Sequence, residues 1–444
     1  MQTREKTTTA RSAALTVLLR CEKQGAWLDG ALKSEIRAGG LSPRDAALCS
    51  KICYGVCQNQ LLLTFWLSRF SKVKPEKLEP AVRLSILMAM YQIKLLDKIP
   101  ERAAVNEAVK LARANSKNPR SPALVNGILR SFCRQADALP QPEELSVRYS
   151  HPQWLIQLLD RELNHQGVEE LLACNNSEPP TTVQTNTVRI SPDELKRELE
   201  AQGVTVEPHP WLEGCLTLRG TGDLETLEAF QEGHFLVQDA ASKLAVLAAD
   251  PQPGMQVLDA CAAPGGKSFS AGIQMQGKGR ILSCDIHKGK VRQIQQGARR
   301  LGLDLIATQV ADAKREQPDW RQTFDLVLCD VPCSGLGIIR KKPDIRWKDP
   351  EALAQLPQVQ QSILDNVSGY VRAGGVLLYS TCTVLRRENE DVMHRFLEAH
   401  PEFVLEKFVL PGSMGAVPEG YITLWPHLHG TDGFFIAKMR KRHD

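Results

Sequence analysis

The sequence has no apolar run of about 20 residues, the length that a membrane-spanning helix needs. The nearest candidates are interrupted by charged side chains such as Arg83 and Lys94. The first residues also lack the apolar core of a signal peptide, and 12 cysteines in 444 residues are too sparse for a disulfide framework. These absences argue against a membrane-spanning protein and a disulfide-stabilised secreted domain. We expect a monomer in the cytoplasm that has no membrane partner.

Two common nucleotide-binding motifs are missing as well. The G-x-G-x-x-G pattern of dinucleotide-binding folds is absent. A P-loop would require a glycine five positions before Gly266, but Cys261 stands there, so the Gly266-Lys267-Ser268 ending is an incomplete P-loop. An ATPase therefore stays only as an alternative, to be tested by ATP binding. The histidines lack the spacing of metal ligands, and we expect no metal site.

Positive charge is concentrated in the N-terminal part of the chain. Residues 1–150 hold 24 Lys and Arg against 13 Asp and Glu, or +11, which leaves 31 against 38, or −7, for the remainder. Such an excess is typical of a surface that binds nucleic-acid phosphates, although a solvated helical surface explains it as well. Charge alone leaves both interpretations open.

Residues 1–140 are predicted to form an all-α bundle. Apolar residues recur at spacings of three and four, and prolines separate the segments. One helix start is explicit, because Ser42 is a capping residue followed by a proline at the first helical position and an acid at the third. Three cysteines on one helical face lack a second pair that would complete a zinc site, so we interpret them as buried apolar side chains: Cys49, Cys53 and Cys57.

Residues 145–235 are predicted to form a small α+β domain. We expect a helix that starts near His151, a strand over 182–186 and a second helix capped by Ser191. Nothing in this zone indicates a function by itself.

Residues 236–444 are predicted to form an α/β domain with a mainly parallel, doubly wound, Rossmann-like sheet, because buried strand patterns alternate with helical patterns. In such sheets ligands bind beyond the carboxyl ends of the strands, so we expect the chemistry at that edge. The strands are expected at 257–260, 280–285, 305–310, 324–330 and 375–382, and the helices at 267–276, 288–301, 358–372 and 388–399.

The first of these strands runs into a loop of small residues, 259–268, with two glycines that let the backbone approach a ligand closely. Asp285 closes the next strand, where a carboxylate can accept hydrogen bonds from ribose hydroxyls. Asp312 follows the third strand and can accept a hydrogen bond from an adenine amino group. Acids at the ends of successive strands repel phosphates and attract a sulfonium cation, so we expect S-adenosylmethionine as the cofactor.

Two cysteines stand at the ends of later strands. Cys333 follows Asp330 in the sequence Asp-Val-Pro-Cys, and Cys382 follows Thr381 some fifty residues later. Because the two strands are expected to lie parallel in one sheet, their ends share an edge, and the two thiols would meet there. This position favours chemistry over packing.

The motifs Asp-x-Cys-Ala-Ala-Pro-Gly-Gly-Lys, Asp-x-Pro-Cys-Ser-Gly-x-Gly and Ser-Thr-Cys together resemble those of the RNA (cytosine-5)-methyltransferases. Over nearly its whole length the chain is similar to the bacterial RsmB-type enzymes of this family. In that group a NusB-like helical domain and a small RNA-recognition-like domain precede the catalytic domain. The resemblance implies S-adenosylmethionine-dependent methylation of C5 of one cytosine in 16S ribosomal RNA, which would be the partner.

The resemblance also implies roles for particular residues. Cys382 would be the nucleophile that adds to C6 of the base, and Cys333 would assist product release. Asp330 would complete the cofactor pocket and, if protonated, could donate to N3 of the base. Val331 stands where the family more often has alanine, which leaves the reactive groups unchanged. The implied cofactor-binding residues are Cys261, Ala262, Ala263, Pro264, Gly265, Gly266, Lys267, Asp285, Asp312 and Asp330.

A basic segment with an aromatic residue, 339–347, follows the Cys333 loop. Interleaved cations and an aromatic side chain suit phosphate contacts and base stacking, whereas a solvated basic loop would have the same composition. A stacked base could not reach the site, so the target nucleotide must be unpaired or flipped. The predicted RNA-contacting residues are Arg340, Lys341, Lys342 and Arg346.

One alternative belongs to a different class of function. A non-catalytic RNA-binding factor built around the NusB-like bundle would have the same basic N-terminal zone. An RNA affinity of residues 1–140 equal to that of the full chain would favour it. The sequence also leaves open what makes Cys382 a thiolate.

Overall fold

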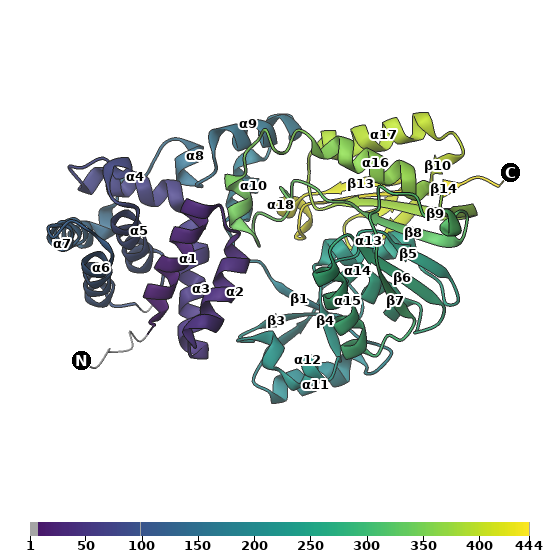
Figure 1. The fold of residues 1–444 in the computed structure, drawn as a ribbon, viewed down its shortest axis with the longest axis horizontal. Helices are drawn as coiled ribbons and strands as arrows, with labels where there is room; N and C mark the ends of the chain where they lie inside the picture. Colours follow the sequence, from purple (N-terminus) through teal and green to yellow (C-terminus); the bar gives the residue numbers. More distant parts are fainter. Residues whose placement is uncertain (1–7, 98, 444) are drawn as a thin grey trace. The chain divides into compact units, whose positions relative to one another are not determined.

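The computed structural model describes residues 8–97 and 99–443, and the chain divides into two compact units (Figure 1). The first unit ends at Asn176 and also contains the segment Lys341–Trp347. The second holds Ser177–Arg340 and the chain from Lys348 onward. Within the described residues no helix combines the length and the apolar character needed to cross a membrane.

The first unit is all helical, as predicted. Thr9 and Ser42 cap two of its helices by accepting hydrogen bonds from backbone N–H groups three residues on. The three cysteines of α3 lie in the apolar core, where their exposed fractions are 9% or less, and the prediction of buried thiols is confirmed. The helices are α1 (Ala10–Gln24), α2 (Leu28–Gly39), α3 (Pro43–Gln58), α4 (Gln60–Phe70), α5 (Pro80–Lys94), α6 (Glu101–Asn115), α7 (Ser121–Arg134), α8 (Leu145–Arg148), α9 (Gln153–Glu162) and α10 (Val168–Asn175).

The first compact unit includes residues beyond the predicted helical domain and ends at Asn176. Helices α8 to α10, which we expected in the middle domain, group with the helical unit. The N–H of Leu61 donates to Ser150 Oγ at 2.8 Å, and Gln58 Nε2 donates to the carbonyl oxygen of Asn176 at 2.6 Å. Periodicity predicts a helix but does not show which core the helix joins.

The segment Lys341–Trp347 caps the ends of two helices in the first unit. At the start of α2, the N–H of Leu28 donates to Asp344 Oδ2 at 3.0 Å. At the end of α3, Trp347 Nε1 donates to the carbonyl oxygen of Cys57 at 3.2 Å. Helix ends leave N–H and C=O groups without intrahelical partners, so these side chains satisfy groups that burial would otherwise leave unpaired.

Arg346 is the most deeply buried part of this segment. Its side chain has no solvent exposure, and Nη1 lies 3.0 Å from the carbonyl oxygens of Gln58 and Ser150 and from Asn176 Oδ1. Burial lowers the pKa of this guanidinium to about 10. The predicted RNA contact of Arg346 stays a prediction, and in this structure its guanidinium donates to protein carbonyl oxygens.

The second unit begins with a small antiparallel sheet of order β2-β3-β1-β4, made by a βαββαβ chain. Asn186 Nδ2 donates to the carbonyl oxygens of Gly233 and Leu301 at 2.9 and 2.8 Å, which fastens this sheet to α15 of the following domain. The predicted small α+β domain is confirmed. Its elements are β1 (Thr181–Thr185), α11 (Pro192–Ala201), β2 (Thr205–Pro208), β3 (Cys215–Arg219), α12 (Glu228–Gln231) and β4 (Phe235–Val237).

The larger sheet of the second unit has the order β10-β14-β9-β8-β5-β6-β7, with β13 paired to β14. Five neighbouring strands, β9, β8, β5, β6 and β7, run parallel to one another. β14 is antiparallel to β9. The predicted doubly wound sheet is therefore confirmed, with an antiparallel edge. The strands are β5 (Gln256–Asp259), β6 (Arg280–Asp285), β7 (Ile306–Val310), β8 (Phe324–Asp330), β9 (Val371–Thr381), β10 (Phe403–Leu405), β13 (Tyr421–Leu424) and β14 (Phe434–Lys441).

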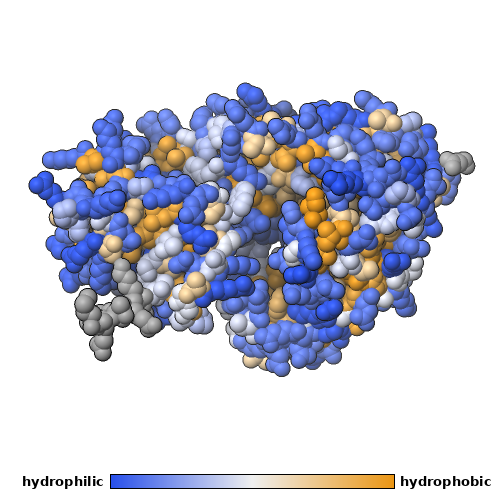
Figure 2. All heavy atoms as spheres, in the orientation of Figure 1, coloured by the Kyte–Doolittle hydropathy of each residue, from blue (hydrophilic) through white to orange (hydrophobic). Residues whose placement is uncertain are grey.

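Helices cover both faces of this sheet (Figure 1). One face packs against α13 and α14, and the other packs against α16 and α17. Successive residues of β8 show the alternation, since Leu326 and Leu328 join the first core and Val327 joins the second. With these side chains inside, the face drawn in Figure 2 is mainly hydrophilic. The helices are α13 (Ala240–Ala249), α14 (Gly266–Gln274), α15 (Lys288–Leu301), α16 (Leu356–Ser368) and α17 (Glu390–Ala399).

Replacing Arg346 with leucine should destabilise the helical unit by roughly 3 kcal/mol, because buried carbonyl oxygens would lose their donor. Hydrogen exchange of α3 amides in the full chain measures this loss within the unit concerned. Lys342→Leu, at an exposed position of the same segment, is the matched control and should leave protection unchanged. Equal protection in the two variants would contradict a structural role for the guanidinium.

Candidate active site

The parallel strands bring the predicted site residues to one edge of the large sheet. The loop that leaves β5 lies between the ends of β6 and β8, because β5 pairs with both strands. Asp330, the last residue of β8, is in register with Ser380 of β9. The loops that follow these strands therefore emerge side by side at the carboxyl edge, as the sequence predicted.

The loop between β5 and α14 is a tight turn against the end of β6. The N–H of Ala262 donates to the carbonyl oxygen of Cys284 at 2.7 Å, and the N–H of Gly265 donates to that of Ala262 at 2.6 Å. Gly265 has a φ of +111°, and a Cβ at this position would lie 2.3 Å from the Phe269 ring. The turn therefore requires glycine.

Asp285 and Asp312 lie at the ends of β6 and just beyond β7. Each carboxylate accepts the backbone N–H two residues further on, at 2.9 and 3.0 Å. Two apolar side chains at the same edge are exposed, Ile286 by 53% and Val310 by 49%. Carboxylate oxygens beside exposed apolar groups suit a nucleoside, and these hydrogen-bond acceptors fit the adenosine part of S-adenosylmethionine.

Negative charge gathers around the loop. Burial raises the pKa of the Cys261 thiol well above its usual range, and the charges of Asp259, Asp330 and Asp285 raise it further. A site surrounded by carboxylates attracts a sulfonium cation and disfavours a polyphosphate. The electrostatics therefore favour S-adenosylmethionine over ATP.

Lys267 and Asp330 form an ion pair between the loop and the end of β8. Lys267 Nζ donates to Asp330 Oδ2 at 2.6 Å and lies 4.9 Å from the centre of the Phe434 ring. Ser380 Oγ donates to Asp330 Oδ1 at 2.9 Å. Both carboxylate oxygens are thus held, and the sequence had assigned no role to Ser380.

The two thiols meet at this edge. Cys333 Sγ lies 2.8 Å from Cys382 Sγ, and the N–H of Cys382 donates to Cys333 Sγ at 3.2 Å. Both side chains are partly exposed, and neither forms a disulfide. The hydrogen bond with Cys382, burial and the charges of Glu388 and Asp330 raise the pKa of the Cys333 thiol well above its usual range. Cys333 is therefore set up to carry a proton beside Cys382.

The basic segment 339–347 is less exposed to solvent than its composition indicated. The Arg340 side chain is 7% exposed, with Nη2 at 3.8 Å from Asp432 Oδ1 and 3.5 Å from the carbonyl oxygen of Thr431. Lys341 is partly buried and Lys342 is exposed. With Arg346 buried, Lys342 is the predicted RNA-contacting residue whose side chain is open to solvent.

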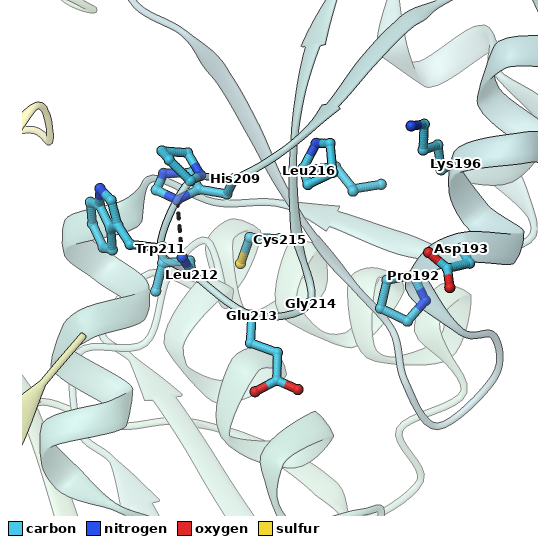
Figure 3. Close-up of a pocket in the computed structure, with 12 residues that line it drawn as sticks. Pro192, Asp193, Lys196, His209, Trp211, Leu212, Glu213, Gly214, Cys215 and Leu216 are labelled. Atoms are coloured by element: carbon cyan, nitrogen blue, oxygen red, sulfur yellow. Dashed lines mark hydrogen bonds between the residues drawn. The ribbon is translucent and has the colours of Figure 1, made fainter. Parts of the chain in front are cut away.

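A separate pocket lies in the small antiparallel domain (Figure 3). His209 and Trp211 pack edge to face with ring centres 4.5 Å apart, and the N–H of Leu212 donates to His209 Nδ1 at 3.2 Å. None of the site residues predicted from the sequence lines this pocket. It contains no reactive pair like the two cysteines, so we place the candidate active site at the edge of the large sheet.

Three family models match the chain. The model described as 16S rRNA methyltransferase RsmB/F matches residues 246–440, and the NusB family model matches 8–134. The third, the ferredoxin-like domain of RsmF/B-like methyltransferases, matches 151–225. The matches fall on the three predicted zones.

Full-length relatives and solved structures agree with these matches. The probable ribosomal RNA small subunit methyltransferase B of Bacillus subtilis is 37% identical, over 98% of this chain and 100% of the relative. Ribosomal RNA small subunit methyltransferase B of Vibrio cholerae is 34% identical, over 98% of both chains. The crystal structure of PH0851 has a TM-score of 0.80 at 27% identity and covers 97% of this chain and 98% of its own. NSun6 from Pyrococcus horikoshii shares the fold. Its TM-score is 0.59 at 22% identity, and the match covers 66% of this chain and 99% of its own.

Asp259, at the end of β5, is buried beneath the loop between β5 and α14 and is hydrogen-bonded to the first turn of α14. It has no solvent exposure, its Oδ2 accepts from Ser268 Oγ at 2.6 Å, and that hydroxyl accepts from Ser283 Oγ at 2.7 Å. Burial raises the pKa of Asp259 from 3.8 to about 6. The native protein therefore binds this proton more tightly than the unfolded chain does.

The stability contributed by the Asp259 proton should fall as the pH rises from about 4 to about 6, by about 3 kcal/mol. Asp259→Asn keeps the acceptor for Ser268 but has no proton to lose, so the difference between wild type and variant should change over this window. Urea unfolding at several pH values measures it. Asp319→Asn, at an exposed position, is the control, and a pH-independent difference for Asp259→Asn would contradict the assignment.

Proposed function

Because the chain belongs to the RsmB/F family of 16S rRNA methyltransferases, we propose that it methylates C5 of a cytosine in 16S ribosomal RNA through a transient bond between Cys382 and C6 of the base. The observation that carries this proposal is the pair of thiols 2.8 Å apart, beside Asp330 at the carboxyl edge of the sheet. Membership in a methyltransferase family sets aside the non-catalytic RNA-binding factor and the ATPase.

S-adenosylmethionine is the cofactor of this family of methyltransferases, as predicted, and supplies the methyl group. The loop from Cys261 to Lys267 would hold it, with Asp285 at the ribose and Asp312 at the adenine. Asp330 would close the pocket on the side of the thiols. The surrounding carboxylates favour the positive charge of the sulfonium.

The two cysteines have different roles in the proposed reaction. C5 of cytosine is a poor nucleophile, so the Cys382 thiolate first adds to C6, and the electron pair displaced from the double bond makes C5 able to attack the methyl group. After transfer a base removes the C5 proton, the double bond re-forms, and the bond between sulfur and C6 breaks to return the thiolate. Cys333, next to Cys382, is placed to assist this last step.

Asp330 is the candidate for binding the base. Asp330 accepts hydrogen bonds from Lys267 and Ser380, so donation to N3 of cytosine would require it to take up a proton when the base binds. The target base must leave its stack to reach this edge. Lys342 is the candidate for a phosphate contact among the residues that follow the Cys333 loop.

Replacing Cys382 with alanine should lower methyl transfer to 16S rRNA by roughly 10⁴-fold or more, because the attacking sulfur is lost. Binding of S-adenosylmethionine, followed by calorimetry, should be unchanged. Cys133→Ala, on α7 of the first unit, serves as the matched cysteine control. Wild-type activity in Cys382→Ala would refute the covalent route.

Replacing Cys333 with alanine should slow release, so that a protein–RNA adduct accumulates on a denaturing gel after incubation with 16S rRNA and the cofactor. The adduct should vanish in the Cys333→Ala, Cys382→Ala double variant, since the bond is formed by Cys382. Absence of any adduct in the single variant, with turnover retained, would remove the release role of Cys333.

A further inference from the structure

A buried polar cluster packs against the two loops that carry Cys333 and Cys382, which we call the cysteine loops. The chemistry proposed above does not use this cluster. It consists of Gln360 on α16 and of Glu388 and Asn389, which precede α17; we call these three residues the thiol clamp. None of their side chains has any solvent exposure. Buried amides and carboxylates are costly unless hydrogen bonds satisfy them, so their partners indicate what they hold.

Gln360 and Glu388 hold the residues on either side of Cys333. The N–H of Ser334 donates to Glu388 Oε2 at 2.9 Å, and Gln360 Nε2 donates to the same oxygen at 2.8 Å. The Gln360 amide also donates to the carbonyl oxygen of Pro332 at 3.0 Å. The backbone is therefore fixed both immediately before and immediately after the sulfur-bearing residue.

Asn389 does the same for Cys382. Thr381 Oγ1 donates to Asn389 Oδ1 at 2.6 Å, and Asn389 Nδ2 donates to the carbonyl oxygen of Thr383 at 3.1 Å. These are again the two chain neighbours of the cysteine. Two consecutive residues, Glu388 and Asn389, thus hold one cysteine loop each.

Two further hydrogen bonds join the parts of this arrangement. Ser334 Oγ donates to Thr383 Oγ1 at 2.7 Å, which links the two cysteine loops directly. Tyr379 OH donates to the carbonyl oxygen of Glu388 at 2.6 Å, which fixes the clamp to β9. The distance between the two sulfur atoms is therefore set by a continuous buried network.

Glu388 brings a charge as well as an acceptor. Its second oxygen, Oε1, is buried and has no hydrogen-bond partner among the described residues. Its charge acts on Cys333 and on Tyr379. The other groups around these two side chains are Cys382 and Asp330 at Cys333, Cys329 and Arg395 at Tyr379, and Lys348, whose Nζ donates to the carbonyl oxygen of Ser334 at 2.7 Å. A negative charge this close to Cys333 disfavours a thiolate there.

We propose that the thiol clamp positions both catalytic cysteines and that the Glu388 charge keeps the proton on Cys333, which leaves Cys382 as the sulfur that attacks. A protonated Cys333 can donate its hydrogen to the Cys382 sulfur at 2.8 Å and so stabilise a thiolate at that atom. This inference rests on the proposed function, because it explains how two adjacent thiols acquire different roles. Glu388, Asn389 and Gln360 act through the cysteines and are positioning residues.

The charge is tested by the alkylation rate of Cys333 against pH, measured by peptide mass spectrometry with iodoacetamide in a Cys382→Ser background. Glu388→Gln keeps an acceptor oxygen for Ser334 but removes the charge. The midpoint of the pH profile for Cys333 alkylation should therefore move about one pH unit lower. At pH values below that midpoint, Cys333 should react about tenfold faster than in the Cys382→Ser parent. Glu390→Gln is the matched control, since that carboxylate accepts from Thr423 Oγ1 and not from a cysteine loop. An identical Cys333 profile in both variants would overturn the charge role.

The positioning role is tested separately with Gln360→Met, which keeps the Glu388 carboxylate but removes the donor to Pro332 and to Glu388. With 16S rRNA as substrate, kcat should fall roughly 100-fold while the KM for S-adenosylmethionine stays unchanged. Wild-type kcat in this variant would overturn the clamp, even if Glu388→Gln failed to fold. Full activity in Cys382→Ala would instead refute the proposed function, and the alkylation profiles, which need no RNA, would still report on Glu388.

Discussion

The parallel pairing of β8 with β9 is the constraint on which the site depends. Register places Asp330 opposite Ser380, so the loops that follow the two strands start side by side and carry Cys333 and Cys382 to within 2.8 Å of each other. A shift of one residue would turn the side chains of one strand to the opposite face and separate the pair. The apolar cores on the two faces of the sheet therefore fix the geometry of the thiols, because they fix the register.

Charge at this edge is arranged in ion pairs, which join Lys267 to Asp330, Lys290 to Asp285 and Arg315 to Asp312. Lys267 pairs with Asp330 and lies over the Phe434 ring, while Asp259, Asp285 and Asp330 all act on the loop that Lys267 ends. The Lys267 ammonium holds Asp330, the carboxylate at the end of the strand that leads to Cys333. In the proposed function this ion pair would contact both the cofactor and the base, and the two binding events would be coupled.

The mainly parallel sheet and the meeting of the two thiols could be predicted because both follow from local patterns and one topological rule. Positions whose environment is made by distant segments could not be predicted. Arg340 and Arg346 look like surface cations in the sequence, but one faces Asp432 and the other faces carbonyl oxygens of Gln58 and Ser150. Glu388 and Asn389 sit in a charged run that resembles a solvated helix start, and only the fold shows that they face the cysteine loops.

The loop that carries Cys333 is followed by a segment that is held by hydrogen bonds at several points. Beyond Arg340 it enters the helical unit, where Asp344, Arg346 and Trp347 satisfy the ends of α2 and α3, and it returns at Lys348, whose Nζ donates to the carbonyl oxygen of Ser334. The ends of two helices bind this segment, whose side chains satisfy N–H and C=O groups that would otherwise lack partners. The same segment is continuous along the chain with the loop that bears the Cys333 thiol.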